Sequence, residues 1–160
     1  MARTSIDLED TQIRRACQVD AADIRELTRS AYAKWIPVIG REPVPMVADY
    51  DRAVREHMID LLFVGAELVA LIETVNRADH LLIENVAVAP SFQGRGYGRL
   101  LLDHAERLAA SLGLPEIKLY TNQRFVTNVE LYGRLGYTID RAEPFMGSAK
   151  VHMSKRVAAA

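Results

Sequence analysis

The residues best suited to chemistry are three alternating glycines that follow an apolar stretch rich in β-branched side chains. That stretch is Leu81–Val88, and the turn after it reads Gln93, Gly94, Arg95, Gly96, Tyr97, Gly98 and Arg99. Glycine has no Cβ to keep a phosphate away from the backbone. A helix pattern follows at once, and the first N–H groups of a helix lack intrahelical partners and carry partial positive charge. The pattern therefore predicts a site for a phosphorylated ligand.

Two common phosphate-binding motifs do not fit this turn. A P-loop requires a Gly-Lys pair, and the sequence contains none. A dinucleotide fingerprint requires Gly-x-Gly-x-x-Gly and an acidic residue at the end of the next strand. Here the glycines alternate, and the next strand is followed by Asn122. The spacing therefore disfavours a site for ATP or NAD.

Two carboxylates lie where they could transfer protons. Glu84 sits within the apolar stretch, and Glu73 belongs to the strand expected beside it. A carboxyl in apolar surroundings tends to have a raised pKa, which suits a general base working near neutral pH. Unbroken strand alternation would put Glu84 on one face with Val86 and Val88, and Asn85 on the other. Either carboxylate could equally pair with an arginine or line a wet edge.

The elements that position these residues follow one another in an order that indicates an α/β fold. The expected strands are 12–16, 61–64, 68–75, 80–88, 117–121, 137–141 and 150–155. The expected helices begin after Asp20, at Pro45, after the glycines and at Val126, with Asp20 and Asp23 arranged as in a capping box. Strands joined by a helix should run parallel, and those joined by tight turns antiparallel. The prediction is a mixed α+β arrangement, a mostly antiparallel sheet of six to seven strands with about four helices.

The segment 36–45 between the first two helices is unusual. It holds three prolines and one glycine, so it is not expected to be helical. It is also more apolar than a solvated loop needs to be. The residues alone leave two explanations open, packing onto the core or lining a substrate pocket.

The glycine turn resembles the acetyl-CoA signature of the GNAT acetyltransferases, Gln/Arg-x-x-Gly-x-Gly/Ala. The preceding Val86-Ala87-Val88-Ala89-Pro90 resembles the splayed fourth strand of that family, and Leu131–Tyr137 and Val151–Lys155 resemble its last helix and final strand. The element order is similar over residues 12–156. The resemblance implies one GNAT N-acetyltransferase domain over residues 1–160, with acetyl-CoA as cosubstrate.

The resemblance also implies roles for individual residues. Cofactor contacts are expected from Val86, Ala87, Val88, Gln93, Gly94, Arg95, Gly96, Tyr97, Gly98 and Arg99. Tyr132 matches the family tyrosine that protonates the departing thiolate, although a plain amphipathic helix would also carry a tyrosine there. Phe125 stands where many members have an asparagine. Asn122 and Asn128 are the nearest polar substitutes and are expected to contact the cofactor.

Family members cover their acceptor with the loop between the first two helices, which favours a pocket role for segment 36–45. Trp35, Ile36 and Glu73 are therefore expected to bind substrate, with Glu84 as the first choice of general base and Glu73 as its rival. No nucleophile–histidine pair is apparent, which favours direct attack by the acceptor. The expected function is N-acetyl transfer from acetyl-CoA to a primary amine of a small molecule or peptide. The alternative is a non-catalytic acyl-CoA-binding regulatory domain.

The composition limits the partners and the compartment. A formal net charge of −1 gives no reason to expect a nucleic-acid partner. Cys17 is the only cysteine, which excludes an internal disulfide and, with the polar N-terminal segment, predicts a cytoplasmic protein. No apolar run approaches the roughly 20 residues that span a bilayer, so no membrane association is expected. The histidines are scattered, which predicts no metal site. A homodimer through the sheet edge or the last strands stays open.

Overall fold

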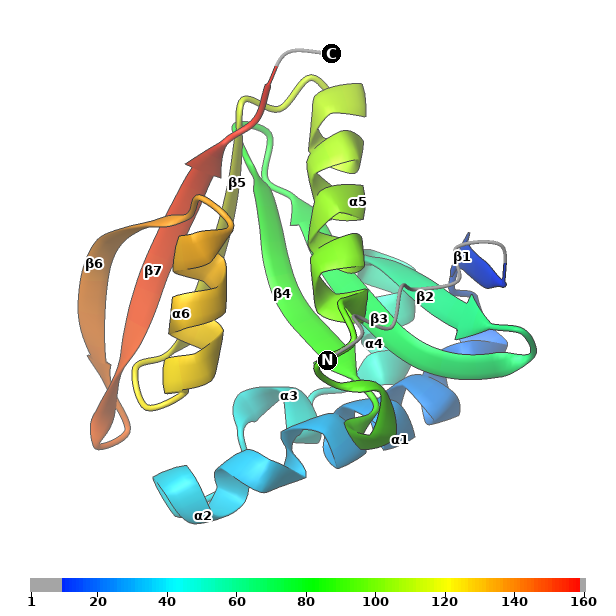
Figure 1. Ribbon diagram of the computed structural model, residues 1–160, viewed down its shortest axis with the longest axis horizontal. Coiled ribbons are helices and arrows are strands. Elements are labelled where there is room, and N and C mark those ends of the chain that lie inside the picture. The colour runs from blue at the N-terminus through cyan, green and yellow to red at the C-terminus, as the bar shows by residue number, and fades with distance from the viewer. Residues whose placement is uncertain (1–9, 159–160) are drawn as a thin grey trace, which may run out of the picture.

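The computed structural model describes residues 10–158 and contains one seven-stranded sheet (Figure 1). Residues 1–9, most of the polar N-terminal segment used in the prediction of a cytoplasmic protein, lie outside this described part. The strand order is β1-β2-β3-β4-β5-β7-β6. The strands are β1 (Thr11–Arg15), β2 (Met58–Val64), β3 (Glu67–Asn76), β4 (Leu81–Val88), β5 (Glu116–Asn122), β6 (Thr138–Phe145) and β7 (Ser148–Arg156). All pairings are antiparallel except that of β4 with β5. The predicted mixed, mostly antiparallel α/β fold is confirmed.

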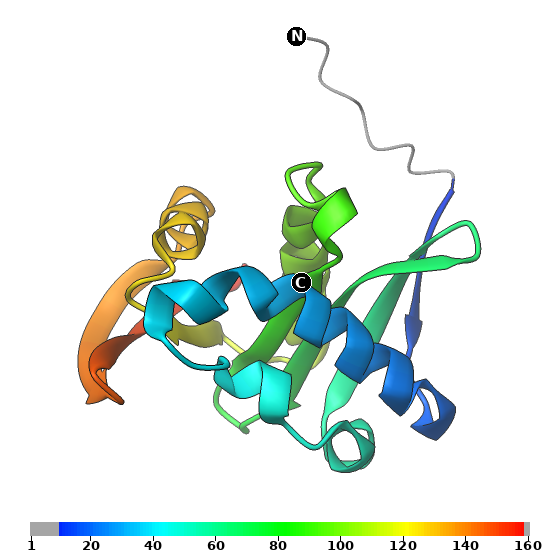
Figure 2. The ribbon, with the colours of Figure 1, turned by 90° about the horizontal axis from the view of Figure 1, so that it is seen from below.

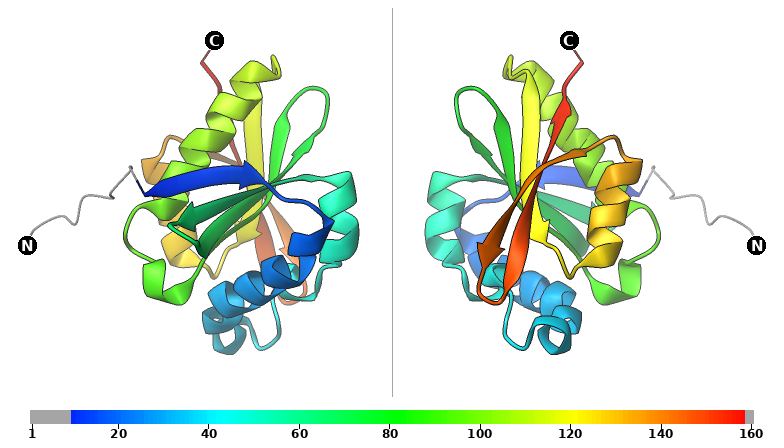
Figure 3. Two further views of the ribbon diagram at one scale, coloured as in Figure 1. Left: turned by 90° about the vertical axis from the view of Figure 1, so that its right-hand side faces the viewer. Right: turned by 90° about the vertical axis from the view of Figure 1, so that its left-hand side faces the viewer.

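Helices cover both faces of the sheet. They are α1 (Ala21–Tyr32), α2 (Ile36–Ile39), α3 (Val44–Val47), α4 (Tyr50–Glu56), α5 (Tyr97–Ser111) and α6 (Val126–Arg134). Helix α1 runs across one face (Figure 2), and α5 and α6 lie on the other (Figure 3). Among residues 10–158, no helix is both long and apolar enough to cross a bilayer.

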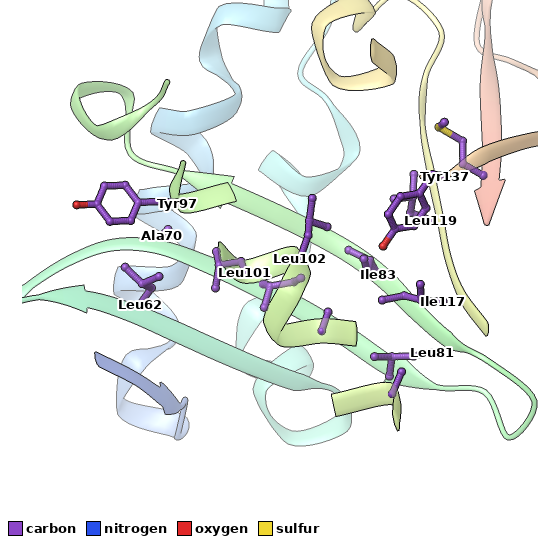
Figure 4. Packing of buried hydrophobic residues seen from close by; sticks show 14 of the residues in the cluster. Leu62, Ala70, Leu81, Ile83, Tyr97, Leu101, Leu102, Ile117, Leu119 and Tyr137 are labelled. Atoms are coloured by element: carbon purple, nitrogen blue, oxygen red, sulfur yellow. The ribbon is translucent and has the colours of Figure 1, made fainter. Parts of the chain in front are cut away.

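Alternate side chains of the central strands pack into two core layers, one on each face of the sheet. Leu62 packs with Leu101 of α5 (Figure 4), and Ile72 belongs to the same layer. Leu61 and Leu71 pack against α1 and α4 instead. All five side chains are fully buried. Each such burial contributes roughly 1.5–3 kcal/mol relative to an exposed side chain. The two layers fix the strand register, because a slip by one residue would exchange the faces.

Strand β4 has a bulge at Glu84, and β5 separates from it at the same place. Neighbouring residues Glu73 and Thr74 of β3 pair with Asn85 and Ile83, so Glu84 has no pairing partner on β3. The ladder between β4 and β5 ends at Ile83. An extra residue bends and twists a strand. From Glu84 onward the two strands therefore diverge and leave a wedge between them (Figure 1).

The expectation that segment 36–45 contains no helix was wrong. Residues Ile36–Ile39 form one α-helical turn directly after α1 and a short 3₁₀ turn. Pro37 lies in the first turn, where no intrahelical partner is needed for an N–H. Gly40 then ends the helix with a φ of +74°.

The single helix expected to begin at Pro45, which periodicity would continue to about Met58, is divided into α3 and α4. Ala48 is extended, and Asp49 caps α4 by accepting a hydrogen bond from the Arg52 N–H at 3.2 Å. Met58 already belongs to β2. Local capping by Asp49 thus prevailed over helical periodicity.

The expected capping box of α1 was also wrong. The Asp20 carboxylate accepts two hydrogen bonds of 2.9 Å from Arg14 and one of 2.8 Å from the Cys17 N–H, and it makes no cap bond to α1. The Arg14 guanidinium holds the pKa of this carboxyl well below its usual range. Asp20 therefore ties the end of β1 to the chain entering α1.

Candidate functional site

Two cavities meet in the wedge between β4 and β5. The larger, about 790 Å³, is bounded by the glycine turn and α6; we call it the glycine-turn groove. The smaller, about 420 Å³, contains Glu73 and lies toward α3, α4 and the β6–β7 turn; we call it the Glu73 cavity. Both are lined by Tyr32, Val86, Asn128 and Tyr132. These four residues mark the junction at which a ligand in one cavity could contact a ligand in the other.

The glycine turn presents backbone to its groove. Gly94 and Gly96 have φ angles of +76° and +93°, a region that other residues enter only with strain, and Gly96 is the N-cap of α5. Gly98 has ordinary helical geometry, and a Cβ added there would meet only Val88 Cγ2, at 3.9 Å. Gly98 thus leaves open space between α5 and β4. The turn offers unpartnered helix N–H groups at the wall of a cavity.

Gln93 ties the turn to β4. Its amide nitrogen donates to the Val88 carbonyl at 2.9 Å, and its amide oxygen accepts from Lys34 at 2.8 Å. The turn is therefore attached both to the central strand and to the chain leaving α1. Burial lowers the pKa of Lys34.

Nine of the residues predicted to contact the cofactor line the glycine-turn groove: Val86, Val88, Gln93, Gly94, Gly96, Tyr97, Gly98, Arg99 and Asn128. The other three lie elsewhere. Ala87 is buried in the core layer under α1, and the Arg95 guanidinium lies 5.2 Å from the centre of the Phe92 ring. Asn122 lines the Glu73 cavity.

Tyr132 projects from α6 into the junction. Burial raises the pKa of its phenol to about 12, so the hydroxyl stays protonated at neutral pH. Among the described residues this hydroxyl has no hydrogen-bond partner, and the ring packs edge-on against Tyr137. The geometry leaves the Tyr132 proton available to a ligand.

Tyr32 is a second junction tyrosine, which the sequence did not reveal. Its hydroxyl lies 2.9 Å from Asn85 Oδ1 and 3.2 Å from the Val86 carbonyl oxygen. Asn85 is buried and its amide reaches Thr28 and Tyr50. Tyr32 occurs at helical spacing at the end of α1, where sequence alone gives no reason to separate it from an ordinary amphipathic residue.

The two candidate bases both line the Glu73 cavity. Glu73 is 5% exposed, and its Oε2 lies 2.6 Å from His57 Nδ1. Burial raises the pKa of Glu73, although the His57 contact opposes the rise, and the charge of Glu84 adds to it. Glu84 accepts a hydrogen bond of 3.2 Å from the Tyr120 hydroxyl, with Arg77 3.9 Å away. The cavity thus combines two nearby carboxylates with a histidine that the sequence did not single out.

The expected separation of Asn85 from Val86 and Val88 is confirmed, because Asn85 bonds to Thr28 and Tyr32 of α1 whereas the two valines pack with the α5 layer. What differs is Glu84, which was expected on the valine face and lies in the bulge. Asn85 and Glu84 line the same cavity, although unbroken alternation would separate them. The bulge at Glu84 interrupts the alternation, so that Ile83 and Val86 pack against one core layer although they are three residues apart. A bulge is fixed by pairing with β3, which periodicity along β4 does not report.

The expected substrate residues of the apolar segment are placed differently. Trp35 lines the glycine-turn groove, and its ring stacks on Phe125 with 4.5 Å between ring centres. Phe125 in turn lines the Glu73 cavity, so this stacked pair stands between the two cavities. Ile36 is half-buried and borders neither cavity.

Within residues 10–158, no group of three or more His, Cys, Asp or Glu side chains is arranged to hold a metal ion. Cys17 is exposed beside α1 and borders neither cavity. The candidate acid–base groups therefore include Tyr32 and Tyr132 at the junction, and Glu73, Glu84 and His57 in the Glu73 cavity.

Solved structures with the same fold include acetyltransferases with different acceptors. The PaiA N-acetyltransferase from Thermoplasma acidophilum, in complex with coenzyme A, aligns with a TM-score of 0.79 and 19% identity over 91% of this chain and 98% of that one. The ribosomal-protein-S18-alanine N-acetyltransferase from Escherichia coli gives 0.73 and 18%, covering 94% and 96%. The spermidine N-acetyltransferase from Vibrio cholerae, in complex with CoA and spermine, gives 0.72 and 17%, covering 93% and 96%. At these identities the similarity establishes the fold.

The sequence itself also matches a family. The acetyltransferase (GNAT) family matches residues 22–137, a range that includes α1, the bulged β4, the glycine turn and α6. Because this range is well over half of the chain, the protein belongs to the GNAT acetyltransferase family.

Proposed function

We propose that this protein transfers an acetyl group from acetyl-CoA to a primary amine by direct attack of the amine on the thioester. The observation that carries the proposal is the junction of the two cavities. A groove walled by helix N–H groups meets the cavity that holds the two candidate bases, Glu73 and Glu84, and Tyr132 lies at their contact. A backbone suited to phosphate supports only cofactor binding, and acid–base side chains support many reactions. Their combination at one junction is what supports acetyl transfer.

In this proposal the glycine turn holds the pyrophosphate of acetyl-CoA. The N–H groups at the start of α5 bind the phosphate oxygens, and Arg99 adds positive charge at the wall of the groove. The pantetheine arm would lie along β4, where separation from β5 leaves backbone groups beyond Ile83 without ladder partners on that side. One N–H of this edge would stabilise the oxyanion that forms on the acetyl carbonyl.

Two side-chain roles complete the proposal. The acceptor enters as an ammonium with an intrinsic pKa of about 10, so a base must take its proton before attack. Glu84 is our first choice and Glu73, beside His57, is the rival; both line the cavity. Tyr132, whose pKa is raised to about 12, would donate a proton to the departing thiolate. Because Cys17 lies outside both cavities, an acyl-enzyme through it is not part of the proposal.

The acceptor is less defined than the reaction. The similar structures are named for a ribosomal-protein alanine and for spermidine, so the fold supports acceptors of very different charge and size. A small amine and a peptide amine both stay within the proposal. A cytoplasmic location belongs to it as well, since the single cysteine fits a reducing compartment.

The test has two stages. First, melting temperatures are compared with acetyl-CoA, ATP or NAD present, because a ligand that binds the native state raises apparent stability. Only acetyl-CoA should raise the melting temperature. Second, release of free thiol is measured over a panel of primary amines. Stabilisation without thiol release for any amine would support the alternative, a non-catalytic acyl-CoA-binding regulatory domain. Absence of stabilisation by acetyl-CoA would contradict both.

A further inference from the structure

Part of the Glu73 cavity carries positive charge that the cavity does not neutralise. Arg41, in the loop between α2 and α3, and Lys150, on β7, both line it. The Arg41 guanidinium carbon lies 5.4 Å, and the Lys150 ammonium 4.2 Å, from the centre of the same Phe145 ring. Contact with the ring stabilises each cation, but it leaves two like charges close together. Segments far apart in the sequence thus converge on one positive patch.

The other charged groups in this cavity already have partners. Arg52 binds Glu56 with a shortest contact of 2.9 Å, and Asp49 caps α4. Glu73 binds His57 at 2.6 Å. Within residues 10–158, neither cation of the positive patch lies within ion-pair distance of a carboxylate. The cavity therefore holds paired charges at one part and two unpaired cations at another.

Neither cation forms an ion pair with a carboxylate of residues 10–158. Glu143 stands opposite Lys150 on the β6–β7 ladder, but it is engaged by His152 at 2.9 Å and by Arg141 at 3.3 Å. The hydrogen bond from His152 lowers the pKa of Glu143, the charges of Arg141 and His152 add to this shift, and the charge of Lys150 contributes least to it. The Nε of Arg41 is buried without a hydrogen-bond partner. A buried donor of this kind is costly unless a ligand satisfies it.

Tyr120 sets the spacing between the positive patch and the acidic part of the cavity. Its hydroxyl donates to Glu84 at 3.2 Å, while its ring centre lies 4.7 Å from the Lys150 ammonium. Tyr120 thus contacts the candidate base with its hydroxyl and the cation with the face of its ring, which keeps the two groups within about the reach of one aromatic ring of each other. Asn122 lies on the same wall, and its side-chain oxygen already accepts two hydrogen bonds, which leaves its NH₂ group to a ligand.

We propose that Arg41 and Lys150 form an anion-binding subsite for the acceptor, and that the acceptor is a primary amine bearing a carboxylate about one aromatic ring away from its nitrogen. This inference rests on the proposed acetyl transfer and adds the charge of the substrate to it. The amine would lie toward Glu84 and Tyr132, and the carboxylate would be bound by the two cations and the Asn122 amide. A polyamine would instead place a second ammonium against the positive patch.

The test uses three acceptors that share the benzylamine frame and differ in the charge at the para position. These are 4-(aminomethyl)benzoate, benzylamine and 1,4-bis(aminomethyl)benzene, compared by kcat/KM for thiol release at saturating acetyl-CoA. The carboxylate should be preferred over benzylamine by at least about tenfold, because hydrogen bonds to charged groups are the strong ones. The diamine should be the poorest. The preference should shrink as salt is raised. Equal values for the three, or a preference for the diamine, would overturn the subsite.

Variants separate this subsite from the reaction itself. In the Arg41→Gln/Lys150→Gln double variant, the ratio of kcat/KM for 4-(aminomethyl)benzoate to kcat/KM for benzylamine should fall to about one. Arg41→Lys should keep part of the preference for the carboxylate. Lys118→Gln, which removes a half-buried lysine that is paired with Glu116 and lines neither cavity, is the matched control and should keep the full ratio. An unchanged ratio in a folded double variant would contradict the assignment.

Failure of the proposed reaction can be told apart from failure of the subsite. If no amine releases thiol, binding of the same three compounds is measured by calorimetry on protein saturated with acetyl-CoA. Tighter binding of 4-(aminomethyl)benzoate than of benzylamine, lost in the double variant, supports the subsite without turnover. Equal affinities in the wild type overturn it, whatever the reaction turns out to be.

Discussion

The contribution of the glycine turn can be isolated at Gly98. Gly96 is a poor place for a substitution, because its φ of +93° would strain any side chain whether or not a ligand binds. Gly98 has ordinary helical geometry, and an added Cβ meets only Val88 Cγ2 at 3.9 Å, an ordinary contact. Gly98→Ala should therefore fold. It should even gain up to about 1 kcal/mol of stability, because alanine favours the helix over glycine.

The same substitution should weaken acetyl-CoA binding. The new methyl group would occupy space at the groove wall that a phosphate must enter to reach the N–H groups at the start of α5. Loss of one hydrogen bond to a charged group costs about 1.5–3 kcal/mol. The dissociation constant should then rise by about 10–150-fold. Gly98→Val should raise the dissociation constant at least as much.

Gly133→Ala provides the matched control. Gly133 lies in α6, has open space around its Cβ position and does not line the groove. Both alanine variants should raise the melting temperature, by about 2–4 °C per kcal/mol gained. Only Gly98→Ala should raise the dissociation constant, measured by calorimetry. A stabilised Gly98→Ala protein that binds acetyl-CoA as tightly as the wild type would refute the assignment of the turn.

Three further outcomes follow from the junction. Tyr132→Phe should lower the single-turnover rate about 10²–10⁴-fold with acetyl-CoA affinity unchanged, because only the proton donor is removed; a loss below about threefold would exclude the role. Trp35→Ala should raise the acceptor KM, because Phe125 loses a stacking partner worth about 0.5–1.5 kcal/mol; a lower melting temperature with an unaltered KM would make Trp35 a packing residue only. The raised pKa of Glu73 means that the folded state holds its proton to higher pH than the unfolded chain, which has a pKa near 4.5. Wild-type stability relative to Glu73→Gln should therefore fall as pH rises from about 4.5 through the folded pKa, and parallel melting curves would contradict this.

Much of the fold was predictable because its signals are local. The glycine turn, Pro90 after the apolar strand, and the helix that follows are neighbours in the chain, so their order alone indicates β4, the turn and α5. Periodicity placed the strands to within a few residues. It failed where a single capping group decided the outcome, as at Asp49, or where a proline fell in a first turn, as at Pro37.

The acid–base groups were only partly predictable. Glu84, Glu73 and Tyr132 could be named from their position in a strand or from the family motif. His57 and Tyr32 could not, because each is an ordinary helix-end or helix-face residue until the sheet brings it to the junction. The sequence also gave no sign of the bulge, which depends on which residues of β3 pair with β4.

By itself the sequence determined a turn suited to phosphate between a strand and a helix, the strands and helices of a mixed sheet, and two carboxylates in its middle strands, since the sequence signals for these features lie within a few residues of one another. Only the tertiary structure decided that the bulge at Glu84 lies where β5 separates from β4. The bulge brings the Glu84 carboxylate and the Asn85 amide into one cavity. The tertiary structure also decided that Arg41 and Lys150, more than a hundred residues apart, share one ring and one cavity. Long-range pairing sets such positions, because the register between strands is fixed by burial on both faces and not by any residue's immediate neighbours.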